Sequence, residues 1–177
     1  IGAGEQKMPE FLKISANNKI PAIVDHDAGV NLMESGAIMF YLAEKHKQFL
    51  PTGSIGRATV MEWLMWQMGG LGPMLGQAHH FLHFNPGKSD YAEIRFQNEV
   101  ARLYDVLDKR LDGRQYICDD YSIADMACWP WVARYEWQRV NLAAYPNVRS
   151  WYQRLLTRSA VQRGYHVPKK MSEIPTG

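Results

Sequence analysis

The spacing of apolar residues changes once along the chain, at about Pro51, and this change restricts the folds open to it. Before Pro51, short apolar runs alternate with turn residues; after it, apolar residues recur three and four positions apart. The first pattern is typical of short strands and the second of amphipathic helices. We therefore expect an α+β fold for the 177 residues, with a mixed unit at 1–51 and an all-helical unit at 52–177.

Within the mixed unit, the pattern predicts two strands and one helix. Residues 20–24 form an apolar run typical of a buried strand, and residues 30–33 form a second one. Apolar residues at i, i+3 and i+4, starting from Ile38, predict a helix over 34–46.

The second unit contains three long segments with helical spacing, at about 60–84, 90–111 and 148–155. Three glycines and a proline at positions 69–73 interrupt the first of these segments. Because proline lacks the N–H that a helix needs, we expect a bend there.

Two features of the mixed unit suggest a binding site. If the Ile20–Pro21 bond is cis, the Ile20 N–H and C=O turn away from the sheet and can pair with a ligand's peptide bond. Glu34 and Ser35 stand where a helix begins, a place that favours a ligand carboxylate, and Glu34 can hold an ammonium group. The alternative is that Pro21 only marks a strand edge and Ser35 only caps a helix.

Composition argues against several classes of protein. A net charge of +2 gives no reason to expect nucleic acid as a partner. No apolar run approaches the roughly 20 residues of a membrane helix. Cys118 and Cys128 are not in a CxxC motif, so we expect two reduced thiols in a cytoplasmic protein.

Two clusters of side chains each allow two interpretations. His79 and His83 have the spacing of two metal ligands on one helix face, but no carboxylate or cysteine accompanies them, so we expect no metal. Trp63, Trp66 and Phe81 either line a hydrophobic substrate cleft between the two units or belong to the core.

Four stretches of the sequence resemble glutathione transferases. "NKIPAIVD" followed by "ESGAIMFYLAEKH" resembles their glutathione-binding half, and "YSIADMACWPW" resembles their helix-6 signature, in which Ser122 and Asp125 form a capping box. "WLMWQMGGLGPMLGQAHHF" and "GEQKMPEFLKISANNKIPAIVD" are similar to the bacterial Nu class, related to the fungal nitrogen-regulation prion domain. The resemblance covers essentially the whole chain and implies a thioredoxin-like N-terminal domain, an all-helical C-terminal domain and a homodimer.

The resemblance also implies a glutathione site in the N-terminal domain. Glu34 and Ser35 match the pair that holds the γ-glutamyl end, and the backbone of Ile20 matches the group that pairs with the cysteinyl unit. The other implied contacts come from Pro21, Gln6, Lys19 and Arg102, the last toward a glutathione in the partner subunit.

The family's first β-α-β unit, which carries the thiol-activating residue, precedes the residues aligned with Gly4, Glu5 and Gln6. The sequence has almost nothing at that place, so we name no catalytic residue. We expect either a piece of a longer product or a poorly stable protein with an exposed sheet edge and exposed apolar surface.

The activity implied is glutathione-dependent disulfide reduction, which uses two glutathiones and no protein cysteine. Conjugation or peroxide reduction would be weaker side activities. The alternatives are a non-catalytic binding or regulatory protein of the same fold, and a helical interaction module that does not bind glutathione.

Overall fold

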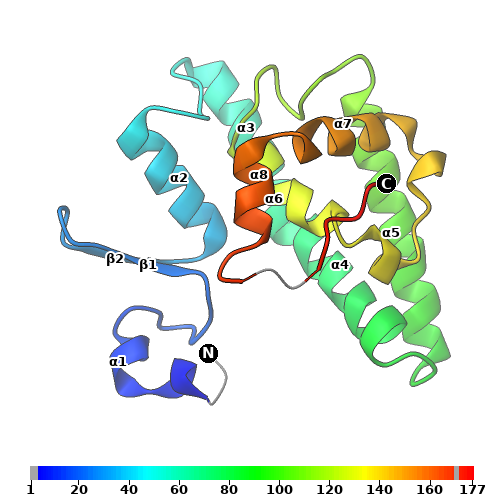
Figure 1. The fold of residues 1–177 in the computed structure, drawn as a ribbon, viewed down its shortest axis with the longest axis horizontal. Helices are drawn as coiled ribbons and strands as arrows, with labels where there is room; N and C mark the ends of the chain where they lie inside the picture. The colour runs from blue at the N-terminus through cyan, green and yellow to red at the C-terminus, as the bar shows by residue number, and fades with distance from the viewer. Residues whose placement is uncertain (1–3, 170–171) are drawn as a thin grey trace.

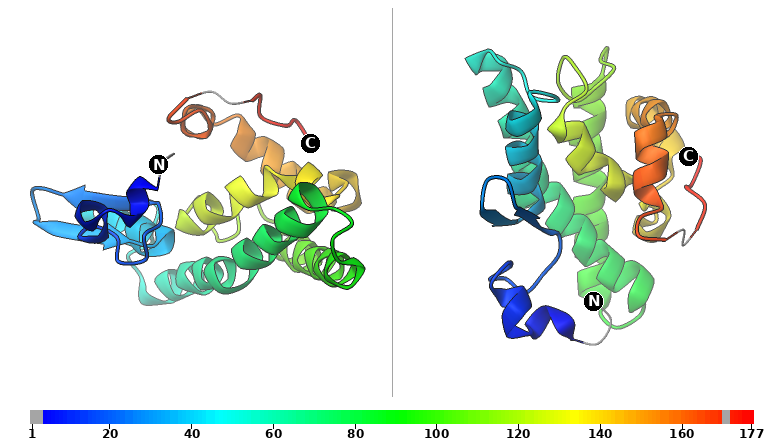
Figure 2. Two further views of the ribbon diagram at one scale, coloured as in Figure 1. Left: turned by 90° about the horizontal axis from the view of Figure 1, so that it is seen from below. Right: turned by 60° about the vertical axis from the view of Figure 1, so that its left-hand side comes forward.

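The structure is a computed structural model that describes residues 4–169 and 172–177. A small mixed unit lies at one end of the molecule and helices form the rest (Figure 1), an arrangement also seen from two further sides in Figure 2. The elements of the mixed unit are η1 (Glu5–Lys7), α1 (Pro9–Leu12), β1 (Ala22–Asp25), β2 (Val30–Met33) and α2 (Ser35–His46).

The two strands form an antiparallel pair in which Ala22 faces Met33 and Asp25 faces Val30. Both strands were predicted, but the first begins at residue 22 rather than 20. The reason is that Pro21 has no N–H to give to a strand ladder, so it precedes the strand instead of joining it.

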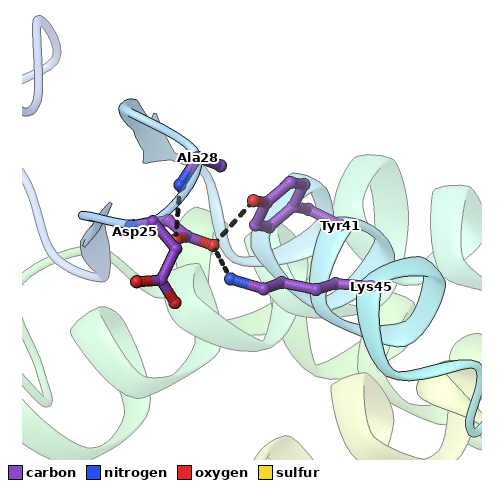
Figure 3. Close-up of polar contacts among 5 residues, drawn as sticks. Asp25, Ala28, Tyr41 and Lys45 are labelled. Carbon is purple, nitrogen blue, oxygen red and sulfur yellow. Dashed lines mark hydrogen bonds and ion pairs between the residues drawn. The ribbon is translucent and has the colours of Figure 1, made fainter.

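Asp25 ties the hairpin to helix α2 (Figure 3). One carboxylate oxygen accepts from the backbone N–H of Ala28 at 3.2 Å, which closes the turn. The other accepts from Tyr41 Oη at 2.7 Å and from the Lys45 ammonium. The hydrogen bonds from Lys45 and Tyr41 hold the pKa of Asp25 well below its usual value, so this carboxylate stays charged.

The helical unit follows the apolar spacing of the sequence, and helix α6 lies at its centre, against α2, α3 and α7. None of the helices in the described part of the chain is long and apolar enough to cross a membrane. The elements are α3 (Ser54–Trp66), η2 (Gln67–Leu71), α4 (Gly72–Ala78), η3 (His79–Phe84), α5 (Asp90–Leu111), α6 (Ile123–Val132), η4 (Tyr135–Gln138), η5 (Leu142–Ala144), α7 (Pro146–Leu156) and α8 (Ser159–Tyr165).

The predicted capping box is present at the start of α6. Ser122 Oγ accepts from the backbone N–H of Ala124 at 3.3 Å, and Asp125 accepts from the backbone N–H of Ser122 at 3.0 Å. Asp125 is fully buried and also accepts from Ile117 N–H at 2.9 Å and from Trp151 Nε1 at 2.8 Å. One carboxylate therefore organises the helix start and its surroundings.

Where glycine and proline predict a bend, the structure has a π-helical turn. The segment η2 connects α3 to α4 without a break, and the Gly72 N–H donates to the Gln67 C=O, five residues back. Such π-helical turns are rare and occur often at functional sites. Its position is relevant here because η2 borders a cavity next to the mixed unit.

Candidate functional site

A cavity of about 520 Å³ lies between the mixed unit and the helices. Its volume falls within the roughly 300–1,000 Å³ of pockets that hold small ligands. One wall comes from the loop before β1, the end of β2 and the start of α2. This wall contains Ser15, Asn17, Lys19, Ile20, Pro21, Met33, Glu34 and Ser35.

Ile20 presents its backbone to this cavity. The Ile20–Pro21 peptide bond is cis, the condition that the sequence left open. Neither the N–H nor the C=O of Ile20 has a hydrogen-bond partner among the described residues. Both groups can therefore pair with an extended ligand in the manner of an added strand.

Ser15, which sequence reasoning did not single out, holds the loop that leads to Ile20. It is completely buried, and its Oγ donates to the Lys19 C=O at 2.9 Å. The Lys19 N–H donates back to the same Oγ at 3.4 Å. Ser15 thus fixes the backbone just before the exposed Ile20.

Glu34 and Ser35 form the polar end of this wall. Glu34 is the residue before α2, and its side chain makes no capping hydrogen bond. Ser35 is the first residue of the helix, so the alternative in which it is only an N-cap is wrong. Its hydroxyl makes only a weak contact, at 3.7 Å, to the sulfur of Met68. The free N–H groups at the start of this 12-residue helix favour an anionic group of a ligand.

The opposite wall comes from η2, α4 and α6. A Cβ added to Gly72 would lie 2.4 Å from Gln67 Nε2 and 3.1 Å from the Trp131 ring, so only glycine fits there without displacing the neighbouring side chains. The residues of this wall are Gln67, Met68, Gly72, Pro73, Gly76, Gln77 and Trp131.

Sequence reasoning missed Gln67, although a signal was available. Its side chain is 3% exposed, and it continues a stripe of core positions that includes Leu64 and Leu71. A polar residue in such a stripe needs an explanation. Its Oε1 is buried and has no partner among the described residues, which costs about 1–3 kcal/mol if it stays unpaired.

Two of the predicted glutathione contacts lie outside this cavity. Gln6 is in η1 and does not line the cavity. Arg102, on α5, forms hydrogen bonds of 2.8 and 2.7 Å with Glu99 and borders a different pocket. The role of Arg102 toward a partner subunit and the role of Gln6 stay predictions.

The aromatic residues proposed for a hydrophobic cleft do not line this cavity either. Trp63 and Trp66 pack edge to face, with ring centroids 5.1 Å apart, against the core. Phe81 stacks on Phe96 at 5.5 Å. Their role in binding a second substrate stays a prediction.

The surroundings of His79, Cys118 and Cys128 are those of residues with a structural role. His79 is 9% exposed, lies 2.9 Å from the amide nitrogen of Gln138 and stacks on Trp131. Burial lowers the pKa of His79 to about 4, so its imidazole is neutral near pH 7. No group of three potential metal ligands occurs among the described residues. Cys118 and Cys128 are buried, and burial raises the pKa of both thiols.

Comparison with known proteins relates this geometry to a family. Residues 1–44 match the glutathione S-transferase N-terminal domain, and residues 90–154 match the glutathione S-transferase C-terminal domain. The chain is 54% identical over 166 residues to disulfide-bond oxidoreductase YfcG of Escherichia coli strain K12, covering 90% of this chain and 77% of that protein. It is 41% identical to disulfide-bond oxidoreductase YghU of the same strain, covering 93% of this chain and 60% of YghU.

Solved structures give the same relationship. A glutathione transferase from Burkholderia graminis, with two glutathione molecules bound per subunit, superposes with a TM-score of 0.88 at 40% identity. That alignment covers 95% of this chain and 75% of the other. A glutathione transferase from Pseudomonas putida, with one glutathione disulfide bound per subunit, has a TM-score of 0.87 at 44% identity, covering 93% of this chain and 76% of the other.

Proposed function

The chain belongs to the glutathione S-transferase family, and on that basis we propose that the cavity beside Glu34 binds glutathione. The observation that carries the proposal is the convergence of Ile20, Glu34 and Ser35 on one cavity. The Ile20 backbone pairs with the cysteinyl unit of glutathione, and Pro21 and Lys19 border that unit. The start of α2 and the Ser35 hydroxyl bind the γ-glutamyl carboxylate, and Glu34 accepts from the ammonium group.

We further propose that the bound glutathione reduces disulfides. A first glutathione thiolate attacks one sulfur of a disulfide, forming a mixed disulfide and releasing one substrate thiolate. A second glutathione thiolate attacks the glutathione sulfur of the mixed disulfide, giving glutathione disulfide and the second substrate thiolate. The two protons lost by the glutathiones end on the two product thiols. The names of YfcG and YghU, and the glutathione disulfide bound by the Pseudomonas putida protein, support this reaction.

No cysteine of the chain takes part in this reaction. Cys118 and Cys128 are buried, and their raised pKa keeps them as thiols, whereas the thiolate is the reactive form. Glutathione itself supplies both electrons, so the chain's own residues only bind and orient the two thiols and the disulfide.

The fold is the expected one, a thioredoxin-like N-terminal part followed by an all-helical part. In our proposal the two domains meet at about Pro51, as 1–51 and 52–177, and the chain acts as a homodimer. The cytoplasm suits this activity, because glutathione keeps thiols reduced there.

Calorimetric titration with reduced and oxidised glutathione tests the proposal. We expect saturable binding of both, weakened about tenfold in Ser35→Ala because a hydrogen bond to a charged group is lost. Ser54→Ala is the matched control, since Ser54 is the first residue of helix α3, as Ser35 is of α2, and is exposed away from the cavity.

A disulfide assay then separates catalysis from binding. Reduction of a small disulfide by the chain and glutathione, slowed in Ser35→Ala but not in Ser54→Ala, supports the enzyme. Binding without reduction would leave the alternative of a non-catalytic binding protein. A folded chain that binds neither form of glutathione would refute the proposal.

A further inference from the structure

The helical wall of the cavity carries a buried glutamine amide that the protein leaves unused. Gln67, the first residue of η2, is 3% exposed and lines the cavity. Its Oε1 is buried, and neither Oε1 nor Nε2 has a hydrogen-bond partner among the described residues. A primary amide can donate two hydrogen bonds and accept two, and the protein itself uses none of this capacity.

A second buried glutamine shows how the same fold treats a structural amide. Gln138 is 0% exposed; its Oε1 accepts from Tyr104 Oη at 2.7 Å, and its Nε2 donates to the Trp131 C=O at 2.7 Å. The Nε2 also lies 2.9 Å from His79 Nε2. Since buried amides normally find partners within the protein, the contrast indicates that the partner of Gln67 comes from elsewhere.

Gly72 keeps the Gln67 amide in place beside the cavity. A Cβ at position 72 would lie 2.4 Å from Gln67 Nε2, so any larger residue would displace the amide. Gly72 and Trp131 line the same cavity, as does Gly76, whose Cβ position is 3.7 Å from the Trp131 ring. Gly72 thus lets the amide pack directly against the helix backbone, and both the amide and the Trp131 indole border the cavity.

Gln67 lines the cavity from the helical unit, whereas Glu34 and Ser35 line it from the mixed unit. The neighbouring Met68 marks the point where the two walls meet, because its side chain lies 3.2 Å from the Cβ position of Gly36 and its sulfur accepts from Ser35 Oγ. A ligand half held at the start of α2 therefore leaves the space along Gln67 and Gly72 to another group.

We propose that Gln67 binds the half of a peptide-bearing disulfide that is not held by Glu34 and Ser35. A peptide half offers carbonyl, N–H and carboxylate groups, and a neutral amide can pair with each of them. Because glutathione occupies the Glu34–Ser35 site in the proposed reaction, Gln67 would favour disulfides of glutathione whose other half carries peptide groups over those whose other half is apolar. This inference rests on the proposed glutathione site and adds the residue that binds the second half of the disulfide.

Gln67→Met tests this, because methionine has a similar length but no hydrogen-bonding group. We expect oxidised glutathione, which has two peptide halves, to bind about tenfold more weakly. The first equivalent of reduced glutathione should bind within about twofold of the unchanged protein. Since an unpaired amide is replaced by an apolar group, the urea midpoint should stay the same or rise.

Two further variants serve as controls. Gln97→Met makes the same change at an exposed position of α5 and should alter neither binding nor the urea midpoint. Gln138→Met removes the paired amide and should lower the urea midpoint.

The outcomes separate this inference from the proposed function. Suppose that both forms of glutathione bind and that Gln67→Met weakens the binding of neither, or of both equally. Gln67 then does not bind the second half and the inference is wrong, while the proposed glutathione site is still supported. A loss of stability like that of Gln138→Met would show that Gln67 is structural, which also overturns it. If the unchanged protein binds neither form, the proposed site and this inference fail together.

Discussion

At position 34 the backbone has a conformation that is costly for any residue but glycine, with φ 71° and ψ 117°. Such strain, of order 1–3 kcal/mol, persists mainly where the residue has a function. Glu34→Gly and Glu34→Ala both remove the carboxylate, but only glycine relieves the strain. We expect both to weaken glutathione binding in calorimetry, and Glu34→Gly to be more stable than Glu34→Ala by about 1 kcal/mol in urea unfolding.

Equal stability of these two variants would contradict the claim that Glu34 is strained. Glutathione binding unchanged in both would instead contradict its role toward the ligand ammonium. The two measurements thus address the conformation and the charge of one residue separately.

His79 makes the stability of the fold depend on pH. Burial, with smaller effects of Arg134 and His83, lowers its pKa from 6.5 to about 4. The unfolded chain therefore takes up a proton below about pH 6.5, whereas the folded chain does so only near pH 4. The contribution of neutral His79 to the free energy of unfolding is fully present above about pH 6.5 and is lost as the pH falls toward 4.

The expected loss is about 2 kcal/mol, after allowing for partial screening by solvent. Urea unfolding of the unchanged protein and of His79→Gln, at a series of pH values from 7 to 4, measures it. The variant should show a shallower decline, whereas His26→Gln, at an exposed turn position, should follow the unchanged protein. Parallel curves for the unchanged protein and His79→Gln would refute the assignment.

Among the helices, α6 depends most on a single carboxylate. Asp125 accepts hydrogen bonds from the backbone N–H groups of Ile117 and Ser122 and from the Trp151 indole, all buried. Asp125→Ala leaves these donors unpaired, so we expect the free energy of unfolding to fall by at least about 3 kcal/mol. Asp119→Ala, at an exposed position that makes a single ion pair with Arg114, should change it by less than about 1 kcal/mol. A small effect of Asp125→Ala would show that water replaces the carboxylate.

At the scale of elements, the periodic spacing of apolar residues was the most reliable guide. It predicted the helices near 34–46, 60–84 and 90–111, each of which contains buried apolar residues. It did not predict α8, because only Val161 and Tyr165 of its seven residues pack on the core. It also gave no indication that the interrupted helix would continue as a π-helical turn, because that depends on packing.

The two walls of the candidate site also differ in how far the sequence predicts them. The wall with Ile20, Glu34 and Ser35 could be predicted because a proline, a strand and a helix start lie within one short stretch of sequence. The buried Gln67 left a signal in the sequence, but its position across the cavity did not, because the wall with Gln67 and Trp131 forms only when η2, α4 and α6 pack together. Tertiary contacts between distant segments leave little trace in local pattern.

At the scale of the whole molecule, a second cavity of about 600 Å³ opens between α6, α8 and Phe49. Its walls are mostly apolar and aromatic, and two arginines border it. Arg134 lies over the rings of Trp137 and Tyr165, and Arg158 lies 3.8 Å from the ring centre of Tyr121. Neither arginine forms an ion pair with another described residue. The cavity therefore combines apolar surface with positive charge, which suits an apolar anion.

We expect the folded 177-residue chain to enhance the fluorescence of anilinonaphthalene sulfonate, an apolar anion that reports exposed apolar surface. Ala160→Asp should weaken this binding several-fold, because Ala160 is exposed and borders the cavity, where a carboxylate repels the sulfonate. Near the start of α8 an aspartate is favourable, so stability should not fall. Ala101→Asp, on the exposed face of α5, adds the same charge away from the cavity and should leave the fluorescence unchanged. An equal loss in both variants, or no enhancement by the unchanged chain, would mean that this surface does not take up apolar anions.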